Sequence, residues 1–215
     1  GTHWASLIHT RGVVLRNLDA AIETFESIAE NAPVARTGPN PVPDAVVYEA
    51  LFSVFVAHGR TDLMPAYITR MLGQNILPTA YVANLLIKGY AQDGPLGLVE
   101  ARRVFDAMQD PPAGYAAVGN HLPRHYGAGA IGPKRERTFP NGLSNAVDRA
   151  NVLGAMVFRE PSTYEAMIRA ELLHGNTRQA LAVLERMKAR AFPAALIGRA
   201  RAMFDEPSVA GAGRG

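Results

Sequence analysis

The stretch AVVYEALFSVFVAHGRTDLMPAYITRMLGQNILPT, residues 45–79, decides the fold class of this 215-residue chain. A Pro-Asp pair precedes it and a Pro-Thr pair ends it, so one turn signal recurs after 35 residues. The i, i+3, i+4, i+7 spacing of an amphipathic helix is met by four apolar residues, Tyr48, Leu51, Phe52 and Phe55. The opening half of the stretch therefore predicts a helix.

The second half of the stretch predicts another helix. Gly59 is placed to end the first one, because glycine readily adopts the left-handed conformation that stops a helix. Thr61, followed by Asp62, is a favourable N-cap for the second helix, and Pro65 is tolerated near its first turn. Met64, Ile68 and Met71 then face inward. The predicted unit is a helical hairpin.

The same spacing occurs at three further places. First helices are predicted from Trp4, Leu7 and Ile8, from Ala83, Leu86 and Ile87, and from Tyr164, Met167 and Ile168. Second helices are predicted from Ala21, Phe25 and Ile28, from Ala101, Phe105 and Met108, and from Ala180, Leu184 and Met187. Gly12, Gly94 and Gly175 fall near the first-helix ends. Because one hairpin cannot cover its own apolar face, the copies should stack into a curved array whose concave wall binds a partner.

Uneven spacing of the copies predicts insertions between them. We expect hairpins at about 1–31, 45–79 and 80–110, with a proline- and glycine-rich insertion at 32–43 and an irregular one at 111–143. Residues 144–205 should hold an extra helix over 144–158, a fourth hairpin and the start of a fifth, before a disordered tail at 206–215. A helical pattern that starts at once, without an initiator methionine, suggests a piece of a longer protein.

Composition narrows the function classes. A net charge of +3 and a pI near 9.4 permit an anionic partner without requiring one. The absence of cysteine excludes disulfides, thiolate metal sites and cysteine nucleophiles. No apolar run approaches the roughly 20 residues that cross a bilayer, so no membrane partner is expected.

Two short motifs match the letters of chemical sites but not their context. Residues 127–132 satisfy G-x-G-x-x-G, yet no strand precedes them and Pro133 follows. His121 and His125 have the spacing of a zinc pair, yet Pro123 lies between them and no third ligand accompanies them. We therefore predict that the chain is not an enzyme and has no metal site or cofactor.

The 35-residue period, the early aromatic of the first helix, the segment NLLIKGY at 84–90, and Ala101, Phe105 and Met108 resemble pentatricopeptide repeats. The resemblance implies an all-α, right-handed solenoid of helix-turn-helix repeats, an α–α superhelix. It also implies that single-stranded RNA lies on the concave face, with about one base per repeat read by two or three side chains. The implied role is RNA processing, stability or translation in an organelle, namely the mitochondrion.

The resemblance further implies which residues contact RNA. The residue after the aromatic position would read a base, which gives Ala5, Glu49, Asn84 and Glu165. The residue that closes the following turn would assist, which gives Asp44, Thr79 and Ala194 for the first, second and fourth copies, with Asp110 the nearest candidate for the third. Val46 and Tyr81 would sandwich bases, and Lys88 would meet a phosphate.

Several of these residues also have a purely structural interpretation. Asp44 and Thr79 are ordinary helix N-caps, and Ser162 with Glu165 matches a capping box. The acidic residues at positions 49 and 165 favour an alternative function, in which the same groove binds a peptide or helix of a protein partner, as tetratricopeptide-like scaffolds do.

Overall fold

The structure is a computed structural model that describes residues 1–30, 43–74, 76–111 and 157–206. Over these residues the first helices of the hairpins are α1 (Thr2–His9), α3 (Ala45–Ala57), α5 (Ala80–Gln92) and α8 (Pro161–Leu173), followed by α10 (Ala194–Ala202). The second helices are α2 (Leu18–Glu30), α4 (Met64–Gly73), α6 (Gly94–Ala107) and α9 (Thr177–Ala189). A π-helical turn, η1 (Thr10–Val14), extends α1, and a 3-10 turn, η2 (Thr61–Leu63), precedes α4. The all-α fold of helical hairpins predicted from the sequence is confirmed.

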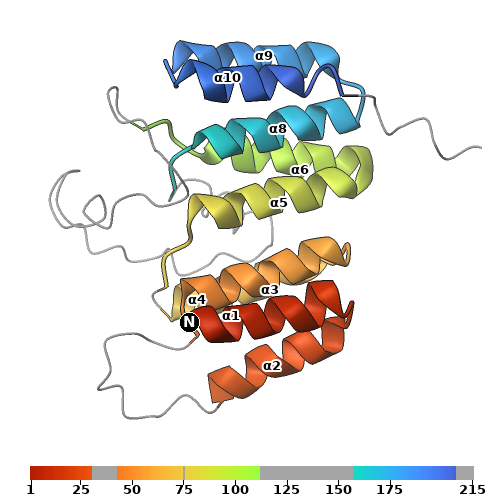
Figure 1. The fold of residues 1–215 in the computed structure, drawn as a ribbon, viewed down its shortest axis with the longest axis vertical. Helices are drawn as coiled ribbons and strands as arrows, with labels where there is room; N and C mark the ends of the chain where they lie inside the picture. Colours follow the sequence, from red (N-terminus) through yellow and green to blue (C-terminus); the bar gives the residue numbers. More distant parts are fainter. Residues whose placement is uncertain (31–42, 75, 112–156, 207–215) are drawn as a thin grey trace, which may run out of the picture.

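The first helices stack on one another in chain order, α1 on α3, α3 on α5, α5 on α8 and α8 on α10, and form one layer of the molecule (Figure 1). Their apolar stripes meet the second helices in a continuous core. Tyr48, Phe52 and Phe55 expose no surface, as the helical spacing predicts. Phe25 of α2 packs edge-on against Tyr48 with 4.9 Å between ring centroids, so the first two hairpins share one aromatic core.

The ends of the first helices follow the sequence signals closely. The Asp44 carboxylate accepts a hydrogen bond from the Val47 N–H at 3.1 Å, and the Thr79 hydroxyl accepts one from the Val82 N–H at 3.4 Å. Both N-cap predictions are thereby confirmed. Beyond the helix C-termini, φ is positive at three glycines, Gly59 (+64°), Gly94 (+78°) and Gly175 (+72°). These glycines allow the left-handed turn into the second helix.

The first copy departs from the predicted register by one residue. Ala5 and Ile8 are buried, whereas Trp4 is 39% exposed and Leu7 is partly exposed. The prediction that Trp4 packs inward is therefore wrong. Gly12 lies within η1 rather than in a left-handed turn, and a Cβ atom there would approach Val54 Cγ2 to 2.3 Å. Its role is the close approach of α1 and η1 to α3.

Two further capping predictions are wrong. Thr61 makes no capping hydrogen bond, because the chain enters α4 through η2 and the Thr61 hydroxyl is buried against Gly89 of α5. The capping box of α8 joins Glu160 and Thr163, whose hydroxyl accepts the Glu160 backbone N–H at 3.1 Å. Ser162 and Glu165 cannot form the box because α8 begins at residue 161, one position before Ser162.

Some predictions lie outside the described residues. They are the insertion at 32–42, the insertion at 112–143, the helix over 144–156 and the tail from 207. The glycine-rich motif at 127–132 and the pair His121 and His125 fall there as well.

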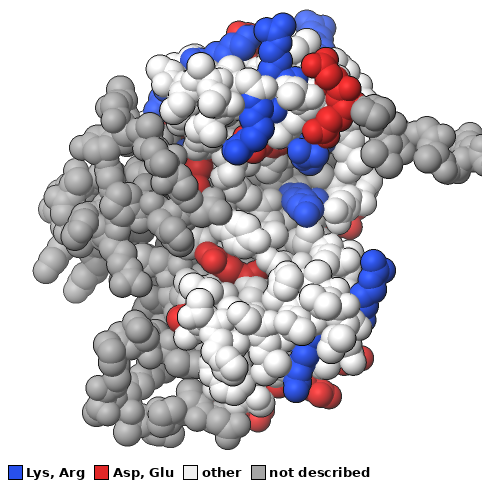
Figure 2. Space-filling view, in the orientation of Figure 1, with Lys and Arg blue, Asp and Glu red and all other residues white. Residues whose placement is uncertain are grey.

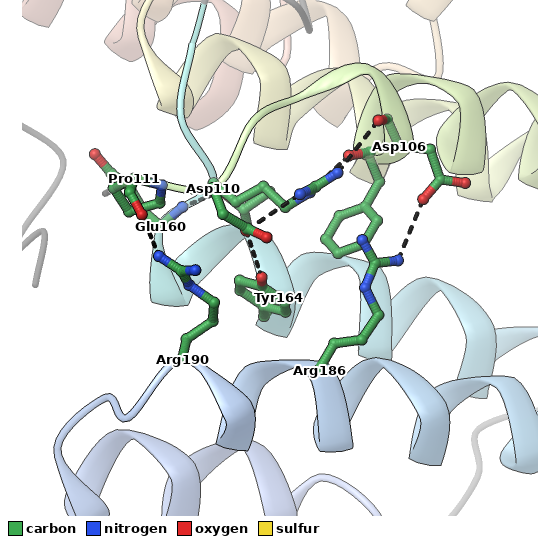
Figure 3. Close-up of polar contacts among 10 residues, drawn as sticks. Asp106, Asp110, Pro111, Glu160, Tyr164, Arg186 and Arg190 are labelled. Atoms are coloured by element: carbon green, nitrogen blue, oxygen red, sulfur yellow. Dashed lines mark hydrogen bonds and ion pairs between the residues drawn. The ribbon is translucent and has the colours of Figure 1, made fainter. Parts of the chain in front are cut away.

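The residues on either side of the 112–156 segment are joined by hydrogen bonds around Arg159, in which Asp110, labelled in Figure 3, takes part. The Arg159 backbone N–H donates to the Gln109 carbonyl at 2.8 Å, and its guanidinium donates to the Phe105 carbonyl at 2.8 Å. The same guanidinium pairs with Asp110 at 3.1 Å and lies 4.8 Å from the centre of the Phe105 ring. Tyr164 donates its hydroxyl to Asp110 at 2.6 Å. These contacts hold α8 against α6, although 45 residues separate positions 111 and 157 along the chain.

Glu160, the N-cap of α8, lies beside this junction (Figure 3). It is 2% exposed, and within the described residues its Oε2 atom has no hydrogen-bond partner. The Ser162 hydroxyl donates to the carboxylate, but burial outweighs this hydrogen bond and raises the pKa of Glu160 from 4.5 to about 7. The carboxylate is therefore a buried charge above neutral pH.

We expect Gly89→Ala to destabilise the fold by about 1–3 kcal/mol, because the new Cβ atom would lie 2.5 Å from the Thr61 hydroxyl oxygen. Thr61→Ala in the same chain should restore most of this loss, since it removes a hydroxyl that has no partner. Gly198→Ala in α10 is the control, because nothing lies within 4 Å of its Cβ position. Urea unfolding measures all three; failure of Thr61→Ala to restore stability would contradict the contact.

Glu160 predicts a pH dependence of stability. The pKa of this carboxyl group is higher in the folded than in the unfolded chain. Its contribution to the stability of the fold is therefore fully present below pH 4.5 and is lost as the pH rises through about 7. The free energy of unfolding of the wild type should fall by on the order of 3 kcal/mol more than that of Glu160→Gln between pH 4 and pH 8, because glutamine does not titrate. Glu185→Gln, at an exposed position, is the control. Parallel pH profiles for wild type and Glu160→Gln would contradict the prediction.

Candidate nucleic-acid interface

The exposed sides of α1, α3, α5, α8 and α10 together form what we call the first-helix face. Three of these helices have N-caps that define matching positions, namely Asp44, Thr79 and Glu160. The fifth residue after each cap, called here the reading position, is Glu49, Asn84 or Glu165. The second residue after each cap is Val46, Tyr81 or Ser162. Val46 is 41% exposed and the other five are partly buried, so the predicted residues of these three hairpins do reach the face.

Ala5 does not belong to this set. It is 9% exposed and follows the α1 N-cap, Gly1, by four residues, as Tyr48 follows Asp44. It therefore occupies the packing position of its helix, and its methyl group offers no hydrogen bond. Ser6 takes the reading position of the first copy and is exposed, with its hydroxyl donating to the Thr2 carbonyl at 3.0 Å. The sequence misled here because Trp4 resembles the aromatic of the other copies.

Each reading-position side chain of the other three hairpins contacts the next first helix. Thr79 donates to the Glu49 carboxylate at 2.5 Å, and Arg199 of α10 pairs with Glu165 at 2.6 Å. Asn84 donates its amide to the Ser162 hydroxyl at 3.0 Å. These bonds tie neighbouring first helices together. They also give the Glu49 and Glu165 carboxylates a partner within the protein, and Asn84 is the uncharged one of these three side chains.

The turn residues have mixed roles. Asp44 and Thr79 cap their helices, and Thr79 also donates to Glu49. Asp110, the candidate for the third copy, instead accepts a hydrogen bond from Tyr164 and pairs with Arg159 at the junction. These two contacts outweigh burial and lower the pKa of its carboxyl. Glu160 holds the corresponding place, because it caps the first helix that follows. Glu160 is far from Asp110 along the chain, so the sequence pattern of the third hairpin does not indicate it. Its position four residues before Tyr164, like that of Asp44 before Tyr48, could have identified it.

A depression of about 340 Å³ opens on the first-helix face between α1, η1, α3 and α5. Tyr81, Leu85, Lys88 and Gln92 of α5 line it on one side, and the opposite lining includes Ser53 and Val56 of α3. The Tyr81 hydroxyl lies 3.2 Å from Ser53 Oγ, which orients the ring against α3. Lys88 is exposed and, among the described residues, makes no ion pair or hydrogen bond. A ring face beside a free ammonium group suits a nucleotide.

Charge is distributed unevenly over this face. Figure 2 shows a largely uncharged surface over α1 and α3, with Lys and Arg side chains gathered toward α9 and α10. Several of these cations already have partners, since Arg199 pairs with Glu165 and Arg169 with Glu206. The face therefore presents few unpaired positive charges to a phosphate backbone.

Across residues 1–30, 43–74, 76–111 and 157–206, no cluster of three or more histidines, aspartates or glutamates is arranged to hold a metal ion. Within that part of the chain, no helix has the length and apolar character to cross a membrane.

Comparisons with known proteins agree with the repeat architecture. A family model described as PPR repeat matches residues 162–192, which span α8 and α9. The chain is similar to "Pentatricopeptide repeat-containing protein 5, mitochondrial" of Schizosaccharomyces pombe, with 23% identity over 197 residues. That match covers 92% of this chain and 12% of the relative, so the chain spans about an eighth of the length of that protein. With its stacked hairpins, the chain is similar to pentatricopeptide repeat proteins in fold as well as in sequence.

Proposed function

We propose that the chain binds single-stranded RNA along the first-helix face, as part of RNA processing, stability or translation in the mitochondrion. The observation that carries this proposal is the regular stacking of the first helices, which aligns the second and fifth residues after each N-cap along one face. Members of the family bind single-stranded RNA with successive repeats. The word "mitochondrial" in the name of the relative supports the compartment.

The strongest contacts should lie on α5. The Tyr81 ring can stack on a base, and Lys88 can pair with a phosphate two helical turns further on. Asn84, between them, has a carboxamide that can hydrogen-bond a base edge. Val46 offers an exposed apolar surface on the neighbouring helix. Asp44, Glu49, Thr79 and Glu165 are engaged within the protein, so we expect them to add less.

The few unpaired cations on the face imply modest affinity for RNA. We therefore propose that this chain holds a few nucleotides and that other parts of a longer protein add further contacts. The peptide-binding alternative drew on the acidic residues Glu49 and Glu165. Their carboxylates already accept hydrogen bonds from Thr79 and Arg199, which weakens that basis.

Binding of a labelled 12-nucleotide mixed-sequence RNA should be measurable at low salt by fluorescence anisotropy, and its affinity should fall as salt rises. Lys88→Gln should reduce the slope of log Kd against log salt by about 0.7, the value for one phosphate contact on a single strand. Lys188→Gln is the matched control, since Lys188 lies on α9 and pairs with Glu185 at 2.6 Å. Equal slopes for both variants would remove Lys88 from the interface, and no binding at low salt would contradict the RNA proposal.

Tyr81→Ala should weaken RNA binding by about 1–3 kcal/mol, because the stacking surface for one base is lost. Tyr81→Phe keeps the ring and removes only the hydroxyl contact with Ser53, so its Kd should stay within about twofold of wild type. Circular dichroism should show equal helix content in both variants. If Tyr81→Phe bound RNA as weakly as Tyr81→Ala, the ring would not be the stacking group.

A further inference from the structure

The contacts between neighbouring hairpins are not alike along the stack. The second helix of a hairpin packs on the first helix of the next hairpin at three places, α2 on α3, α6 on α8 and α9 on α10. Among the described elements, α4 makes no comparable contact with α5. The contact of α3 with α5 is also less extensive than those of α1 with α3 and of α5 with α8. The boundary after the second hairpin is therefore held mainly by its first helices.

Two other boundaries each contain a histidine that joins the C-terminal ends of the first helices. His58, the C-cap of α3, has its Nε2 atom 2.8 Å from the Gly12 carbonyl oxygen of η1. His174, the C-cap of α8, has its Nε2 atom 2.7 Å from the Ala91 carbonyl oxygen in the last turn of α5. A carbonyl only accepts hydrogen bonds, so the ring nitrogen donates, and carbonyls of a last helical turn lack partners within their helix. Each histidine is thus a clamp between consecutive first helices.

The boundary between α3 and α5 has an aspartate in place of this clamp. Asp93 is the C-cap of α5 and follows its N-cap by 14 residues, as His58 and His174 follow theirs. A carboxylate cannot donate a hydrogen bond to a carbonyl. Among the described residues, the Asp93 side chain makes no hydrogen bond or ion pair. The C-terminal ends of α3 and α5 are therefore not joined in the same way.

The close contact at this end of the boundary is between Thr61 of η2 and Gly89 of α5. The Thr61 hydroxyl is buried there, and within the described part of the chain it has no hydrogen-bond partner. Separation of the two helices would let water bond this hydroxyl, which would offset part of the packing that is lost. The depression of about 340 Å³ lies at the same boundary, with Ala57 and Gln92 in its lining.

Directional bonds join α3 and α5 nearer the N-terminal end of α5. Thr79, the N-cap of α5, donates to the Glu49 carboxylate at 2.5 Å. The Tyr81 hydroxyl lies 3.2 Å from Ser53 Oγ. These bonds fix one end of the contact, whereas the other end is closed by packing alone.

We propose that the contact between α3 and α5 is a hinge of the stack, which pivots on the bonds near the N-terminus of α5 and opens at the C-terminal ends of the two helices. The hinge separates α1–α4 from α5–α10, and a histidine clamp lies on either side of it. Opening widens the depression on the first-helix face, so the hinge controls access to Tyr81 and Lys88. This inference concerns the chain alone and does not depend on RNA binding.

The test measures distances between spin labels on introduced cysteines, which is direct because the natural chain has no cysteine. Ala57, Gln92 and Leu173 are exposed and each follows its N-cap by 13 residues, so they occupy matching positions on α3, α5 and α8. Ala57→Cys with Gln92→Cys spans the hinge, and Gln92→Cys with Leu173→Cys spans a clamped boundary. In double electron–electron resonance, the first pair should show an additional longer distance that the second pair lacks.

Substitutions at the C-caps test the cause of this difference. Asp93→His supplies the missing donor and should lower the ratio of open to closed forms at the hinge roughly 2- to 10-fold, as expected for one hydrogen bond. His174→Ala removes a clamp and should raise that ratio at the Gln92 and Leu173 pair by a similar factor. Asp93→Ala is the control, since it removes the carboxylate without adding a donor, and it should change the ratio less than Asp93→His does.

Each result bears on the inference. A single distance of equal width for both label pairs, in chains with unchanged C-caps, overturns the hinge. Equal effects of Asp93→Ala and Asp93→His show that loss of the carboxylate is sufficient and overturn the missing clamp as the cause. An unchanged distribution at the Gln92 and Leu173 pair in His174→Ala overturns the role of the histidine.

Discussion

The burial of each first helix between its neighbours is the interaction on which the described structure depends. A hairpin such as α3 and α4 has aromatic and aliphatic residues on more than one side of its first helix, so pairing with its own second helix leaves part of that surface uncovered. Its neighbours α1, α2 and α5 complete the burial. At roughly 25 cal/mol per Å² of apolar surface, this is the largest favourable term available to a chain without disulfides.

Close packing of the first helices also determines where polar groups can go. Side chains at the helix N-termini serve two purposes, as Thr79 does when it caps α5 and donates to Glu49 of α3. Such bonds align neighbouring helices, because the donor and the acceptor can meet only at one shift of one helix along the axis of the other. The spacing of residues on the first-helix face is thus a consequence of the same contacts that hold the helices together.

The junction at Arg159 shows how the stack accommodates a long interruption. Its guanidinium binds carbonyls at the C-terminal end of α6, where helix carbonyls otherwise lack partners, and pairs with Asp110. The stacking order of α5 and α8 then matches that of helices joined by a short turn. The same arrangement buries the Glu160 carboxylate, and its pKa is raised because it is buried with few hydrogen bonds.

The sequence by itself determined the helical hairpins, the inward stripes of three first helices and the N-caps Asp44 and Thr79, because these follow from local spacing and backbone hydrogen bonding. It also identified Val46, Glu49, Tyr81, Asn84, Lys88 and Glu165 as residues of one face. Only the tertiary structure decided that Ala5 is core and that Glu160, rather than Asp110, caps the first helix that follows the third hairpin. It alone paired Glu49, Asn84 and Glu165 with the next helix, since those partners are 30 to 78 residues away and no local pattern specifies them.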